Sequence, residues 1–184
     1  IWANEYDKNI WETFNNNFPN IELDKRSIIN IDTKDIPDDI IGLIGGPPCQ
    51  SWSAGGAKRG IEDERGKLFY DFIRVLKSKK PLFFLAENVP GILATRNKEA
   101  LDNIKKELLN CGYKVSIEKV NAHDFNVPQD RQRVFFIGLR IDLGIIFKFP
   151  KPLKSKKHLK DAISDLTDNV IIAKNKTYTN GCIC

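Results

Sequence analysis

Along the first 150 residues, segments with apolar residues at helical spacing alternate with short continuous apolar runs. Helical spacing of Ile10, Trp11, Phe14 and Phe18 predicts a helix near residues 7–17, and similar spacing predicts helices over 68–76 and 101–109. Short apolar runs predict strands at residues 1–4, 27–31, 40–44, 82–86, 113–120 and 134–139. The alternation favours an α/β fold with a doubly wound, mostly parallel sheet, in which the last two strands pair.

The pattern changes after Pro150. The stretch from Lys148 to Lys160 is rich in lysine and has little apolar periodicity. We therefore expect one domain over 1–150, followed by a basic linker and the start of a further region over 151–184. The chain contains no methionine, and we expect the fold to be incomplete at both ends.

Composition narrows the class of protein. The chain has 184 residues, of which 41% are hydrophobic and 29% charged, which suits a domain with a real core. Its net charge of +5 permits binding to nucleic acid, and its apolar runs are too short to predict a membrane partner. Four dispersed cysteines predict reduced thiols in an intracellular protein, and Cys182 and Cys184 lack the further ligands of a metal site.

Candidate chemistry begins at Cys49, which follows the 40–44 strand and opens a glycine-rich loop. Most lone cysteines are inert core residues. However, Glu87 follows the 82–86 strand in the equivalent position, and ligands of open α/β sheets bind where such strand ends meet. The sequence therefore predicts that a thiol and a carboxyl group share one crevice.

A third cluster precedes the last predicted strand. Gln129, Arg131 and Arg133 alternate along an extended segment, which would place them on one face. The simpler alternative is a solvated basic turn. Fork-shaped guanidinium donors aimed in one direction suit a carbonyl or phosphate oxygen.

Four segments in order resemble the DNA cytosine-5 methyltransferase family: Asn4-Glu5-Tyr6-Asp7, Pro47-Pro48-Cys49-Gln50, Glu87-Asn88-Val89 and Gln129-x-Arg131-x-Arg133. The resemblance runs from residue 1 to about Pro150. The residues around the motifs are similar to those of bacterial restriction–modification members, including those that methylate within GGCC. The family's first glycine motif, its target-recognition domain and its last two motifs are absent, so we expect this piece alone to be inactive.

The resemblance implies a Rossmann-like, S-adenosylmethionine-dependent methyltransferase fold. It implies methyl transfer to C5 of a cytosine that is flipped out of duplex DNA. Cys49 would add to C6, and Glu87 would bind or protonate N3. Arg133 would contact O2, and Arg131 would add positive charge that favours the thiolate.

The same resemblance implies how cofactor and DNA are held. Glu5 would accept from the ribose hydroxyls, Tyr6 would stack on adenine, and Asp32 would bind the adenine amine, with Asp35-Ile36 as a competing match. Pro48 and Leu68 would line the adenine pocket. The substrate would be held by Gln50, Ser53, Arg65, Asn88 and Gln129.

Two other functions stay open from the sequence. One is an RNA (tRNA) cytosine-5 methyltransferase of the same fold, and the other is an inactive remnant that only binds nucleic acid through its basic linker. For the favoured function we expect a monomer in the bacterial cytoplasm, associated with the DNA of the nucleoid. A cognate restriction endonuclease would act on the same DNA site without direct contact.

Overall fold

The computed structural model describes residues 1–47 and 64–164, with side chains from Leu68 onward in the second range. The chain divides into two compact units. The first comprises residues 1–121 and 132–151, and the second comprises 122–131 and 152–184. The second unit thus includes a segment that lies inside the domain expected over residues 1–150.

The first unit begins with a small parallel β–α–β arrangement. Strand β1 (Ala3–Asn4) and strand β2 (Leu23–Asp24) pair in parallel, and helix α1 (Lys8–Asn17) connects them. The Asp7 carboxylate caps the helix by accepting from the backbone N–H of Asn9 at 2.9 Å. The strand predicted at 1–4 and the helix predicted at 7–17 are therefore confirmed.

The strand predicted over residues 27–31 is wrong. The segment forms a short 3-10 helix, η1 (Ile28–Asn30), and a second one, η2 (Thr33–Asp35), follows it. The Arg74 guanidinium, on helix α2 (Glu64–Lys79), donates to the carbonyl oxygens of Ile28 at 2.7 Å and Ile31 at 2.9 Å. A side chain from another element thus satisfies backbone groups that a strand would have paired in a ladder.

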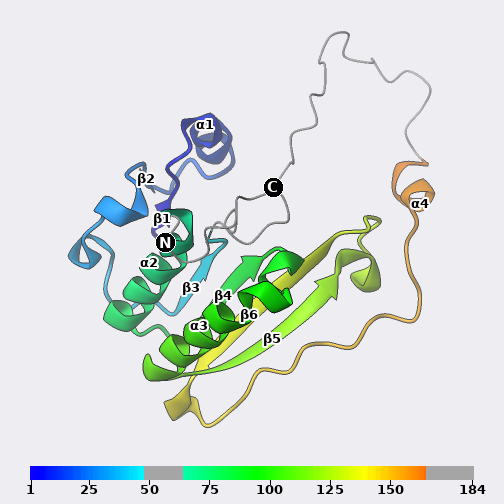
Figure 1. Cartoon of the computed structure of the whole chain (residues 1–184). Coiled ribbons are helices and arrows are strands. Elements are labelled where there is room, and N and C mark those ends of the chain that lie inside the picture. Colours follow the sequence, from blue (N-terminus) through cyan, green and yellow to red (C-terminus); the bar gives the residue numbers. More distant parts are fainter. Residues whose placement is uncertain (48–63, 165–184) are drawn as a thin grey trace. The chain divides into compact units, whose positions relative to one another are not determined.

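The main sheet has the strand order β3-β4-β6-β5 (Figure 1). Its members are β3 (Gly42–Gly45), β4 (Phe83–Asn88), β5 (Tyr113–Asn121) and β6 (Gln132–Arg140). β3 and β4 are parallel, whereas β6 runs antiparallel to both β4 and β5. The pairing of the last two strands is confirmed. Strands β3, β4 and β5 run in the same direction and β6 runs against them, so the sheet is mixed. The β5–β6 pair is antiparallel because its connection is too short for a helical crossover.

Helices α2 and α3 (Lys98–Asn110) pack on the same face of this sheet (Figure 1). The core between them contains Phe69, Phe84 and Phe136, and Phe69 meets Phe136 edge to face at 5.7 Å between ring centroids. Gly112 follows α3 with a φ of +91°, as expected for the glycine that ends it.

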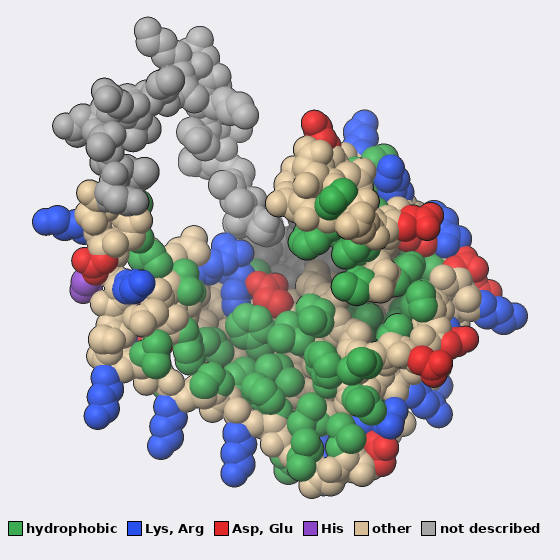
Figure 2. Space-filling view, turned by 180° about the vertical axis from the view of Figure 1, so that it is seen from behind, with side chains coloured by type: hydrophobic (Ala, Val, Ile, Leu, Met, Phe, Trp, Pro, Cys, Tyr) green, Lys and Arg blue, Asp and Glu red, His purple; other side chains and the backbone are tan. Residues whose placement is uncertain are grey.

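The opposite face carries the alternate residues of the same strands. Leu85 of β4 and Phe135 of β6 are half-buried there, and Figure 2 shows hydrophobic side chains gathered on this side. The expected double winding, with helices on both faces, is therefore not seen for this sheet within the part of the unit that the structure describes.

The second unit contains a 3-10 helix, η6 (Ala122–Phe125), and helix α4 (Leu159–Ile163). The Leu153 N–H donates to the Asp124 carbonyl at 2.9 Å, which ties its two segments together. Among the residues that the structure describes, the first unit also has the 3-10 turns η4 (Pro90–Leu93), η5 (Thr95–Asn97) and η7 (Ile141–Leu143). Across residues 1–47 and 64–164, no helix is both long and apolar enough to cross a membrane.

Candidate active site

An ion pair marks the carboxyl end of β4. The Arg133 Nε atom lies 2.7 Å from the Glu87 Oε1 atom. Glu87 is directly opposite Phe135 in the β4–β6 ladder, and Arg133 lies two residues before Phe135, so both side chains project on the same face. The Glu87 side chain is 35% exposed and the Arg133 side chain 18% exposed. The pair therefore presents an acceptor and several donors that an incoming planar ring can reach.

The end of β3 lies beside this pair. Gly45 pairs with Ala86, and a Cβ on Gly46 would stand only 3.6 Å from the Glu87 Oε2 atom. The two strand ends thus open on one edge, as their parallel topology predicts. Cys49 comes three residues after Gly46 in the sequence but lies outside the described residues, as do Pro48, Gln50, Ser53 and the side chain of Arg65.

Asn88 points away from Glu87, because successive residues of a strand project on opposite faces. The residue is 2% exposed. Its Nδ2 donates to the Pro47 carbonyl at 3.2 Å, and its Oδ1 accepts from the Val89 N–H at 3.0 Å. The structure therefore does not bring Asn88 to the face on which a base would meet Glu87.

A cavity of about 1050 Å³ lies in the first unit between the β1 region and β3. It brings together three of the residues expected to hold the cofactor, Glu5, Tyr6 and Leu68. Most of its wall is apolar and includes Trp2, Ile28, Ile36, Ile41, Leu43, Phe72 and Val75. The Glu5 Oε1 atom accepts from the Asp7 N–H at 2.7 Å, which holds this carboxylate at the start of α1.

Ser27 and Ile28 also line this cavity, and sequence reasoning missed them. The only signal was their place just after Asp24, which ends β2, and the basic pair Lys25 and Arg26 that follows it. Hydrogen bonding to Arg26 lowers the pKa of Asp24, and Arg26 also pairs with Asp35 at 2.7 Å. These contacts fix the backbone from which Ser27 projects.

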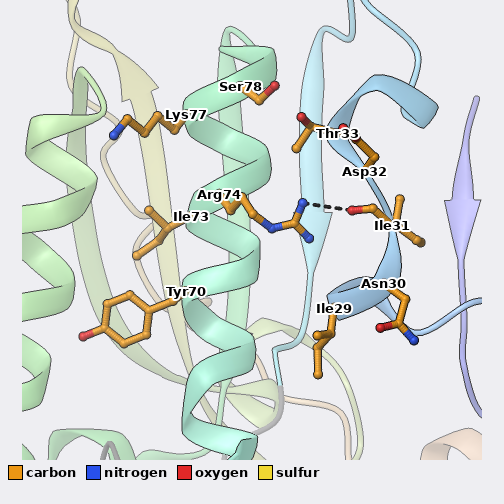
Figure 3. Close-up of a pocket in the computed structure, with 10 residues that line it drawn as sticks. All are labelled: Ile29, Asn30, Ile31, Asp32, Thr33, Tyr70, Ile73, Arg74, Lys77 and Ser78. Carbon is orange, nitrogen blue, oxygen red and sulfur yellow. Dashed lines mark hydrogen bonds between the residues drawn. The ribbon is translucent and has the colours of Figure 1, made fainter.

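Asp32 lies elsewhere. It lines a second cavity of about 600 Å³ between α2 and the η1–η2 segment, together with Thr33, Arg74 and Lys77 (Figure 3). The Asp32 carboxylate accepts from the Lys34 N–H at 3.0 Å and so caps η2. The structure does not bring Asp32 to the larger cavity, whereas Ile36 of the competing match lines it.

Gln129 and Arg131 belong to the second unit. The Gln129 N–H donates to the Val127 carbonyl at 2.7 Å, and the Arg131 carbonyl accepts from the Ala122 N–H at 3.0 Å. Strand β6 begins at Gln132, so only Arg133 of the predicted trio lies within it. Their common orientation stays a prediction.

Comparison with known proteins gives a consistent family assignment. The model of the C-5 cytosine-specific DNA methylase family matches residues 1–184. The chain is 52% identical over 182 residues to the type II methyltransferase M.NgoPII of Neisseria gonorrhoeae, a match that covers 97% of the chain and 53% of that relative. It is also 52% identical to M.FnuDI of Fusobacterium nucleatum, over 100% of the chain and 54% of that relative. The chain spans about half the length of the curated relatives that it matches.

Solved structures support the fold. One described as a DNA modification methyltransferase encoded within a prophage (E. coli) matches with a TM-score of 0.76 and 30% identity, over 91% of this chain and 48% of that one. Spodoptera frugiperda DNMT2 matches with a TM-score of 0.66 and 22% identity, over 85% of this chain and 48% of that one, which is a likeness of fold.

Proposed function

Because the chain belongs to the C-5 cytosine-specific DNA methylase family, we propose that the protein of which it is part transfers a methyl group from S-adenosylmethionine to C5 of cytosine in duplex DNA. The observation that carries this proposal is the Glu87–Arg133 pair at the joint end of β3 and β4. We also propose that it serves a restriction–modification system, and the naming of both relatives as type II methyltransferases supports this.

The larger cavity suits the cofactor. Its volume of about 1050 Å³ accommodates a ligand of nucleoside size, and its apolar wall suits the adenine ring. Glu5 would accept from the ribose hydroxyls, Tyr6 and Leu68 would contact the base, and Ser27 and Ile28 join this set in place of Asp32. When bound, S-adenosylmethionine supplies the electrophilic methyl group.

The ion pair would hold the cytosine ring by its edge. The Watson–Crick edge of cytosine presents O2 and N3, which suit a guanidinium donor and a carboxyl group respectively. We assign O2 to Arg133 and N3 to Glu87. Glu87 would have to take up a proton when the base binds, because the carboxylate paired with Arg133 has none to donate. That proton, shared with or passed to N3, draws electron density from C6, which makes C6 open to attack by a nucleophile.

Cys49 would be that nucleophile. Its thiolate would form a bond to C6, and C5 would then take the methyl group as the methyl–sulfur bond of the bound sulfonium donor breaks. A base would remove the C5 proton, and the electron pair left behind would restore the C5–C6 double bond and expel the thiolate. The target base must leave the duplex for this chemistry, which costs a few kcal/mol. Arg65 and Ser53 would contact DNA phosphate, and Gln50, Gln129 and Arg131 would support the base and its sugar.

The test uses the reading frame extended to its natural ends. The protein is incubated with S-adenosylmethionine and duplex DNA that carries 5-fluorocytosine, and its intact mass is measured. Fluorine at C5 cannot leave as a proton does, so the enzyme stays attached to the DNA. An adduct is expected from the parent protein and not from Cys49→Ser.

A matched variant, Cys111→Ser, removes a half-buried thiol distant from the proposed chemistry and should form the adduct normally. An adduct that persists in Cys49→Ser would refute the assignment of the nucleophile. An adduct formed only on tRNA that carries 5-fluorocytosine would refute the DNA substrate.

A further inference from the structure

Asn88 stands next to the proposed acid but faces the sheet's covered side, where it touches the backbone that leads to Cys49. The strand alternates Phe84, Ala86 and Asn88 toward the helices, and all three are at most 2% exposed. A base that meets Glu87 on the opposite face cannot reach this amide. We therefore infer the role of Asn88 from the backbone groups to which its amide is hydrogen-bonded.

The amide of Asn88 joins the two chains just beyond the last paired residues of β3 and β4. The register of the two strands ends at Gly45 and Ala86, and the next residues of the β3 chain include two prolines, which have no N–H to donate. Pro47 is buried, so its carbonyl oxygen needs a donor from the protein. The Asn88 Nδ2 provides that donor at 3.2 Å.

The orientation of the amide is determined by its two partners. The Pro47 carbonyl can only accept, and the Val89 N–H, 3.0 Å from the Asn88 Oδ1, can only donate. One short side chain therefore joins the chain two residues before Cys49 to the turn that follows Glu87.

We propose that Asn88 is a positioning residue, which holds the carbonyl of Pro47, two residues before Cys49 in the sequence, in place relative to Glu87. This inference rests on the proposed function, because it assigns to Asn88 the alignment of the nucleophile with a base bound at Glu87. Misplacement of reacting groups by about 1 Å costs on the order of 10²-fold in rate.

Asn88→Asp is the sharpest test. Ionised aspartate retains an acceptor for the Val89 N–H but has no donor for the Pro47 carbonyl, at almost unchanged volume. Asn97→Asp is the matched control, because Asn97 is 7% exposed and its Nδ2 donates to the Gly91 carbonyl at 2.7 Å, away from Glu87. Asn88→Ala, which lacks both bonds, gives a second variant with the same expectation if the aspartate variant fails to fold.

The readouts are the rate of adduct formation with 5-fluorocytosine DNA, the dissociation constant of S-adenosylmethionine and the melting temperature, all in the extended protein. We expect adduct formation by the Asn88 variant to slow by about 10²-fold. Its cofactor affinity should stay close to that of the parent, and its melting temperature should fall no further than that of Asn97→Asp.

The results separate this inference from the proposed function. No adduct from the parent protein would refute the proposed function itself. Adduct formation by Asn88→Asp and Asn88→Ala at the parent rate would overturn the positioning role alone. A slowed rate accompanied by an equal loss in Asn97→Asp, or by weakened cofactor binding, would reduce Asn88 to a structural residue and also overturn it.

Discussion

At the scale of single residues, two consecutive residues of strand β4 have different roles. Glu87 and Asn88 are adjacent in the sequence, yet alternation sends the first to the open face and the second into the core. A sequence motif groups these two residues together, because their order along the chain does not show on which face of the sheet each side chain lies. The pairing of β4 with β6 does show it.

Glu87→Gln should remove most of the activity while leaving the fold intact. The amide cannot protonate N3, and loss of a general acid costs about 10²–10⁴-fold in rate. The partly exposed ion pair with Arg133 contributes about 1 kcal/mol or less to stability, so the melting temperature should change little. Single-turnover methylation together with thermal unfolding measures both. Full activity in this variant would exclude Glu87 as the acid.

Glu5→Gln should weaken cofactor binding selectively. The amide oxygen can still accept from the Asp7 N–H, but it is a poorer acceptor for two ribose hydroxyls. Loss of hydrogen bonds to a charged group should raise the dissociation constant of S-adenosylmethionine by about tenfold or more, as measured by calorimetry on the extended protein. Glu22→Gln, at an exposed position, is the control. Equal effects in both variants would contradict the role of Glu5.

At the scale of elements, side chains decide where backbone polar groups find partners. Apolar runs predicted β3, β4, β5 and β6 with small errors at their ends. The same logic failed for η1, because Ile28, Ile29 and Ile31 have strand-like composition while Arg74 from α2 takes two of the carbonyls. Local composition contains no information on an arginine more than forty residues away.

Tyr113 joins two elements through its phenol. It is fully buried at the start of β5, and its OH donates to the buried Pro81 carbonyl at 2.7 Å before β4. Tyr113→Phe leaves that carbonyl without this donor and should lower the free energy of unfolding by about 1–3 kcal/mol in urea titrations. Tyr6→Phe, at a 71% exposed position, should change stability little. Equal stability of Tyr113→Phe and the parent would contradict the contribution of this bond.

The raised pKa of Tyr113 predicts that the protein loses stability at alkaline pH. Burial raises the pKa of Tyr113 from its ordinary 10.0 to about 12. The unfolded chain therefore loses the phenolic proton first, so this contribution to stability is complete below pH 10 and disappears as the pH rises toward 12. Urea titrations from about pH 8 to about pH 11 should show that the free energy of unfolding of the parent falls with pH. The fall should be smaller in Tyr113→Phe, which has no phenol to ionise. Parallel pH profiles would contradict this linkage.

At the scale of the whole molecule, the main sheet has an edge that carries apolar side chains. In the strand order of the described sheet β3 is terminal, and Ile41 and Ile44 are 68% and 69% exposed. Unpaired edge strands with apolar side chains favour association between chains.

Ile44→Lys should therefore reduce aggregation of the 184-residue chain. A charge on an exposed edge position opposes pairing with another chain and costs little stability there. Light scattering as a function of concentration should show a later onset than in the parent. Leu109→Lys is the matched control, because Leu109 is 57% exposed but lies on helix α3 and not on a strand, and this variant should scatter like the parent. An unchanged onset in Ile44→Lys would show that the β3 edge does not drive association.

The sequence by itself determined the family, the order of the motifs and most of the elements. It also placed Glu87 at a strand end, because hydrophobic periodicity is a local property of the chain. Only the tertiary structure decided that Arg133 pairs with Glu87, that Asn88 holds Pro47 and that Asp32 lies apart from the cavity of Glu5. These facts depend on strand register, face and long-range hydrogen bonds, which form between segments that the local pattern treats independently.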